Sequence, residues 1–169
     1  MLSVLFLAVS MACSTEQSAN RSVRTTEPEV QALLDHATSR SETFRSLIAA
    51  LNGSDVIVYV ETSVTRAARL RGHLVHRIVA KDTHRYLRLR LNPFGPVEQR
   101  IGVIAHELQH ALEIAQAPNV GRSETVQSFF ELIGFTHGTQ CGDCYETTRA
   151  LDLERTVREE LRANRSPGR

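Results

Sequence analysis

The sequence of 169 residues has no tryptophan, only three cysteines and almost no net charge, formally +1 at pH 7. A protein whose main partner is nucleic acid needs a net basic surface, so this charge balance argues against that class. The chain also has no internal repeat and no long low-complexity tract. Its 41% hydrophobic and 23% charged residues are those of a globular protein, and its length suits one domain.

The beginning of the chain has one apolar run, residues 2–9, which is too short to span a bilayer. Together with the small residues that follow, it predicts a secretory signal over residues 1–12. Cys13 comes next, as at a bacterial lipoprotein attachment site, so we expect export to the periplasm or cell envelope and a lipid anchor on Cys13 that holds the protein at the membrane. No Lys or Arg precedes the run, and Met11 is unusual at such a site, so an upstream start and a free thiol at Cys13 stay open.

The rest of the chain divides into a predicted disordered tether at residues 13–27, a folded domain at residues 28–163 and a frayed tail at residues 164–169. The domain opens with a helix at Pro28, which we expect to break near residues 39–42. β-branched and alternating residues predict strands at 55–61, 74–80 and 86–91. Helical periodicity predicts further helices at 97–117, 123–133 and 145–161.

The segment 101–115 carries a His-Glu-x-x-His pattern, His106, Glu107 and His110, within a predicted amphipathic helix. Residues four apart lie one above the other on a helix, so both imidazoles can reach one metal ion, and zinc binds neutral imidazole readily. Glu107 lies about 100° round the helix. Its carboxylate can there take a proton from a water that the metal activates. The histidines lie off the apolar stripe, which favours a metal site over two core or surface histidines.

Two histidines leave a catalytic zinc site one protein ligand short. The downstream carboxylates that could supply it are Glu113, Glu124, Glu131 and Glu146. Glu113 lies on the ligand face but a turn beyond the metal, so we expect it to fix a histidine or an arginine instead. Glu146 ranks first, with Glu113 and Glu124 next, because it begins the last predicted helix, which can cross the helix of the motif. For each of them, an exposed helix carboxylate is the alternative.

Cys141 and Cys144 form a CxxC pattern, and the chain has no second CxxC to complete a structural zinc site. In an exported protein we expect the pair to form a structural disulfide, with a redox pair or a zinc half-site as alternatives. Nearby, Tyr145 and His137 are candidates to hydrogen-bond the oxyanion of a reaction intermediate. A core tyrosine and a surface histidine are the more common explanations for these two residues.

The sequence resembles a group of small bacterial HExxH proteins, over roughly residues 56–161. The resemblance is carried by the run into HELQHALEI and by the later segment YETTRALDLERTVREEL. It implies a zincin-like, gluzincin-type metallopeptidase fold but no substrate. The metzincin pattern is absent, because Glu113 stands where its glycine would be and no third histidine follows.

The predicted fold is therefore α+β and zincin-like, with a three-stranded antiparallel sheet packed on the HExxH helix between N-terminal and C-terminal helices. The predicted function is zinc-dependent hydrolysis of peptide bonds in a peptide or protein substrate, with Glu107 as general base. Two alternatives remain. One is a zincin-fold protein without activity, and the other is a helical binding protein of the cell envelope in which the HELQH pattern is accidental.

Overall fold

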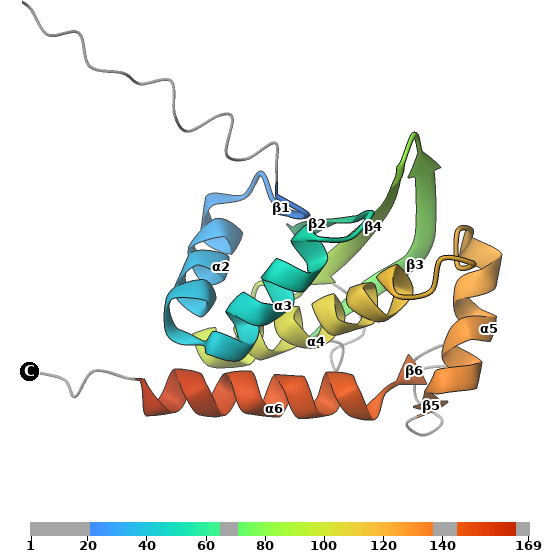
Figure 1. Ribbon diagram of the computed structural model, residues 1–169. Helices are drawn as coiled ribbons and strands as arrows, with labels where there is room; N and C mark the ends of the chain where they lie inside the picture. The colour runs from blue at the N-terminus through green and yellow to red at the C-terminus, as the bar shows by residue number, and fades with distance from the viewer. Residues whose placement is uncertain (1–20, 65–70, 137–144, 165–169) are drawn as a thin grey trace, which may run out of the picture.

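A computed structural model describes residues 21–64, 71–136 and 145–164 and shows an α+β protein. In these residues five helices accompany a four-stranded mixed sheet and a two-stranded ribbon (Figure 1). The elements are β1 (Val23–Arg24), α2 (Pro28–Arg40), α3 (Glu42–Asn52), β2 (Val56–Thr62), β3 (Gly72–Lys81), β4 (His84–Leu91), α4 (Val97–Ala115), α5 (Ser123–Ile133), β5 (Phe135–Thr136), β6 (Tyr145–Glu146) and α6 (Thr148–Ala163). The predicted signal and Cys13, His137, Cys141 and Cys144 lie outside the described residues.

The predicted three-stranded antiparallel sheet is wrong in its pairing. The strand order is β1-β2-β4-β3, and only β3 and β4 are antiparallel, whereas β2 pairs in parallel with both β1 and β4. Parallel neighbours need a long crossover connection. Here β3 lies between the two strands in the sequence, and the turn at Asp82 returns the chain from β3 at the edge to the centre of the sheet as β4.

The predicted disordered tether is also wrong at its C-terminal end. Val23 and Arg24 pair with β2, and Val23 is buried. The carboxylate of Glu27 accepts hydrogen bonds from the backbone N–H and the hydroxyl of Thr62, at 2.8 and 2.6 Å. These contacts fix the entry into α2. Between α2 and α3, Ser41 breaks the helix as expected, because its extended backbone ends one helix and its side chain caps the next.

Alternation along the strands turns one face of the sheet towards the helices. That face is formed by Val56, Val58, Val60, Leu87, Leu89 and Leu91. Helix α4 lies between the sheet and α6 (Figure 1) and is buried along most of its length. No helix in the described part of the chain is long and apolar enough to cross a membrane.

Among the residues that the structure describes, Arg85 is the one cation on the inner face of the sheet, and it contacts the end of α4. Its guanidinium forms a salt bridge with Asp55 at 2.7 Å. It also donates hydrogen bonds to the backbone carbonyls of Ile114, Ala115, Ala117 and Val120. The last carbonyls of a helix have no partner within the helix. Arg85, on β4, donates hydrogen bonds to carbonyls at this end of α4 and so positions the helix relative to the sheet.

Candidate metal centre

The two histidines of the HExxH pattern converge on one side of α4. Both are buried, because α6 and β3 cover this face of the helix. The Nε2 atoms of His106 and His110 lie 3.1 Å apart, and the rings are nearly perpendicular at 79°. The four-residue spacing in a continuous helix therefore aims both nitrogens at one point.

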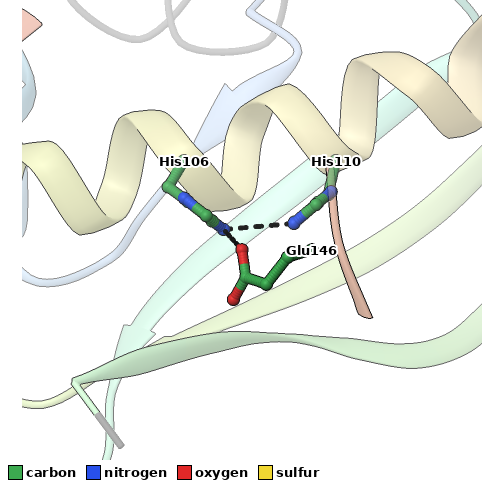
Figure 2. A group of neighbouring side chains, drawn as sticks. All are labelled: His106, His110 and Glu146. Carbon is green, nitrogen blue, oxygen red and sulfur yellow. Dashed lines mark hydrogen bonds and ion pairs between the residues drawn. The ribbon is translucent and has the colours of Figure 1, made fainter. Parts of the chain in front are cut away.

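Glu146 completes the group from a distant part of the chain. Its Oε2 atom lies 2.9 Å from Nε2 of His106, and Figure 2 shows the carboxylate below both rings. Glu146 belongs to strand β6, where it pairs with Phe135 of β5, and not to the start of α6 as predicted. The short ribbon of β5 and β6 ends at Thr147, which caps α6. Glu146 is therefore held between two ordered elements.

The donor set of His106, His110 and Glu146 fits a metal ion. One ligand atom from each lies within 4.8 Å of the others. Zinc binds nitrogen and carboxylate oxygen at about 2.0–2.2 Å in a tetrahedron, which places neighbouring donors about 3.3 Å apart. Two of the three donor separations, 3.1 Å between the histidines and 2.9 Å from His106 to Glu146, differ from that spacing by a few tenths of an ångström. Three protein ligands with a fourth position open are typical of a catalytic zinc site.

A second carboxylate lies behind His110. Glu113 accepts a hydrogen bond at Oε2 from Nδ1 of His110 (3.0 Å) and at Oε1 from the hydroxyl of Thr147 (2.8 Å). Its 4% exposure would by itself raise the pKa of the carboxyl, but the hydrogen bonds with His110 and Thr147 hold the pKa of Glu113 below its usual value. Glu113 therefore fixes the ring of His110 and ties it to the cap of α6.

A third carboxylate, Glu154 of α6, lies behind the other histidine and was not predicted. Its Oε2 atom is 3.4 Å from Nδ1 of His106, and its other oxygen binds Arg158 at 3.2 Å. Helix α6 can come this close because residue 102 of α4 is glycine: a Cβ there would lie 2.7 Å from Cδ of Arg158. A mid-helix glycine one turn before His106 is consistent with such a close helix contact, because glycine has no Cβ to hold the helices apart.

The centre is rich in negative charge. Glu107, Glu113, Glu146 and Glu154 surround the two imidazoles, and Arg158 pairs with Glu154. Burial disfavours the charged form of His106, but the hydrogen bonds with Glu146 and Glu154 outweigh it and raise the pKa of His106 to about 10. The surroundings of this ring therefore stabilise a positive charge.

Glu107 points from α4 towards the edge of the sheet. Its Oε2 atom accepts a hydrogen bond of 2.8 Å from the backbone N–H of Leu74 in β3. The neighbouring His73 has a buried Nδ1 atom without a partner among the described residues. Burial lowers the pKa of His73, although the charge of Glu107 opposes this. The charge of Glu107 is therefore felt by His73, which lies opposite Arg90 in the sheet.

Two other candidates from the sequence, Glu124 and Tyr145, do not belong to this group. Glu124 is exposed in the first turn of α5. The hydroxyl of Tyr145 donates a hydrogen bond of 2.9 Å to Glu131 of α5, so its oxygen is turned away from the ligands. The structure therefore gives no geometric support to an oxyanion role for Tyr145. His137 and the pair Cys141 and Cys144 lie outside the described residues.

The arrangement can hold a metal ion, with a carboxylate beside it that can accept a proton. Comparison with protein family models, with curated proteins and with solved structures finds no match for this chain. Nothing in these comparisons identifies a peptidase. What this centre does must therefore be inferred from its own geometry and chemistry.

Proposed function

We propose that this protein is a zinc-dependent peptidase. The observation that carries the proposal is the convergence of His106, His110 and Glu146 on one point, with Glu107 adjacent in the sequence. Two imidazoles and a carboxylate, with a fourth position left for water or substrate, are the donor set of a catalytic zinc site. An accidental HExxH pattern would not require a third ligand from forty residues downstream to lie beside it.

The chemistry of hydrolysis divides between the metal and the chain. When bound, zinc would supply a Lewis acid that polarises the scissile carbonyl and makes a coordinated water more acidic. Glu107 accepts a proton from the attacking water and delivers it to the leaving amine. The N–H of Leu74 holds this carboxylate at the edge of β3.

A catalytically inactive protein with the same metal site is the second candidate. For both candidates we also propose export and a lipid anchor at Cys13, and these two features rest on the sequence alone. The two candidates differ in whether Glu107 has a chemical role. A hydrolase depends on that carboxylate, whereas a binding protein of the cell envelope keeps its function without it.

The test is cleavage of a mixed peptide library by the zinc-loaded protein and its Glu107→Gln variant. Gln is nearly isosteric but cannot accept the proton, so the variant should keep its zinc and lose activity by a factor of about 10²–10⁴. Glu159→Gln, at an exposed position of α6, is the control and should cleave like the parent. The proposal fails if the zinc-loaded parent cleaves no peptide, or if Glu107→Gln cleaves as fast as the parent.

A further inference from the structure

The face of the sheet opposite the helices carries a hollow that the metal centre does not use. Strand alternation turns Tyr59, Tyr86, Arg88 and Arg90 to this side, and none of them belongs to the core. Tyr59 is 39% exposed, and Val79 of the edge strand β3 is 54% exposed. In Figure 1 the helices lie on the other side of the sheet. The hollow has a volume of about 410 Å³.

The strand registers define the layout of this outer face. Tyr59 of β2 lies opposite Arg88 of β4, which lies opposite Val75 of β3. One step along, Tyr86 lies opposite Val79, and the rings of Tyr59 and Tyr86 stack at 6.5 Å between centroids. Aromatic and aliphatic groups therefore form the middle of the face, and arginines lie beside them.

The charges on the outer face do not balance. Arg88 and Arg90 share a single acid, because their Nε atoms lie 3.6 and 3.2 Å from the same oxygen of Glu61. Arg77, which also lines the hollow, has no ion-pair partner in residues 21–64, 71–136 or 145–164. Three guanidinium groups thus face one carboxylate. Like charges on neighbouring strands destabilise a sheet, so this arrangement has a cost for the isolated protein.

We propose that the outer face binds an acidic segment of another protein. Guanidinium groups match carboxylates with paired hydrogen bonds, and the surplus of two positive charges gives the anions a partner. The tyrosine rings and valines between the arginines provide an apolar surface for the stems of the bound side chains. The site lies on the opposite face of the sheet from the metal centre and does not depend on the peptidase proposal.

Charge and shape favour an acidic polypeptide over two other anionic partners. A nucleic acid is bound by a basic surface with many phosphate contacts, whereas this chain has a net charge of +1 and three arginines at the hollow. A lipid surface is flat and would not enter the hollow that the tyrosines and arginines line. A short extended segment with carboxylates on alternate side chains can reach both the floor and the arginines.

Fluorescence anisotropy with the full chain and labelled decaglutamate tests the proposal. The parent should bind at low ionic strength, and added salt should weaken the binding. The Arg77→Gln, Arg88→Gln double variant should bind about tenfold more weakly, because it removes two of the three guanidinium groups. Glu61→Gln should bind more tightly than the parent, since it frees Arg88 and Arg90 from their shared acid.

The matched control is the Arg155→Gln, Arg162→Gln double variant, which removes the same charge from exposed positions of α6. It should bind decaglutamate within about twofold of the parent. Circular dichroism of every variant establishes that it is folded. The proposal is overturned if the parent does not bind decaglutamate or if both double variants weaken binding equally. It is also overturned if single-stranded DNA or phosphatidylglycerol vesicles bind this face more tightly than the peptide.

Discussion

The two histidines of the candidate centre each have a carboxylate behind them, and the two carboxylates come from different helices. Glu113, which fixes His110, is on the same helix, whereas Glu154, which faces His106, comes from α6. Such carboxylates set the tautomer and the orientation of a ligand histidine. The orientation of His106 therefore depends on how α6 packs against α4, and that of His110 depends less on this packing.

At the residue scale, Glu154→Gln should weaken zinc binding by about 10–100-fold. Gln keeps the size of the side chain but loses the charge that faces Nδ1 of His106. Zinc affinity is measured by competition with a chelator, and Glu159→Gln on the exposed side of the same helix is the control. Equal affinities in the two variants would show that Glu154 does not act on the metal site.

Glu146→Ala should have a larger effect than the loss of any carboxylate behind the histidines. It removes a proposed ligand, so the loss of affinity should exceed about 100-fold, the upper range for a residue that only orients a ligand. Glu124→Ala, at an exposed position in α5, should leave the affinity unchanged. If Glu113→Gln loses the metal and Glu146→Ala keeps it, then α4 supplies all of the protein ligands.

Several of these residues could be found from the sequence, and the reason differs for each. The spacing of His106 and His110 sets their geometry through the helix alone. Glu146 ranked first because we expected it to begin the last helix, although the structure puts it in a strand before that helix. Glu154 was missed, although it lies four residues after Ala150 and three before Val157, on the buried face of α6, where a carboxylate needs a partner.

At the scale of elements, Arg85 links β4 to the end of α4. Arg85→Met should lower the free energy of unfolding by about 1–3 kcal/mol, because it takes this partner from the buried carbonyl of Val120 and from the half-exposed Asp55. Urea unfolding measures the loss. Arg155→Met, which removes an exposed ion pair on α6, should change stability by less than about 1 kcal/mol. Similar losses in the two variants would contradict this account of the helix end.

The contact between Arg85 and Asp55 also predicts how the stability of the fold depends on pH. The hydrogen bond with Arg85 lowers the pKa of Asp55 from its usual value of 3.8, against a smaller opposing effect of burial. A carboxyl with a lowered pKa stabilises the fold above its unfolded value, and this contribution is lost as the pH falls below 3.8. Asp55→Asn should therefore flatten the fall in stability between about pH 4 and pH 2. If urea titrations show the same loss of stability below about pH 4 in Asp55→Asn as in the parent, this role of Asp55 is wrong.

The helices and strands also differ in how well the sequence predicts them. Strong apolar periods predicted α4, α5 and the strands β2, β3 and β4 within a few residues. The two-residue strands β1, β5 and β6 are too short for a pattern, since their pairing comes from partners elsewhere in the chain. The parallel pairing of β2 with β4 also depends on a crossover, so alternation along each strand predicts the strand but not its neighbours.

At the scale of the whole molecule, the candidate centre joins α4 to the β6–α6 segment. A metal bound to His106, His110 and Glu146 would link these elements only in the folded state. Zinc at a free concentration of 100 times its dissociation constant should therefore raise the free energy of unfolding by about 2.7 kcal/mol. Thermal unfolding with zinc and with a chelator measures the shift. In Glu146→Ala the same zinc concentration should have a much smaller effect, and an equal effect would place the metal elsewhere.

The central claim is that this chain binds zinc through the HExxH histidines. The most direct measurement is the zinc content of the full chain after loading and removal of loosely bound metal, compared with the His106→Ala, His110→Ala double variant. The parent should hold about one zinc per chain, because the cluster offers three protein ligands to a single ion. The folded double variant should hold none. Equal zinc in the parent and the double variant, or no zinc in the parent, would contradict the account.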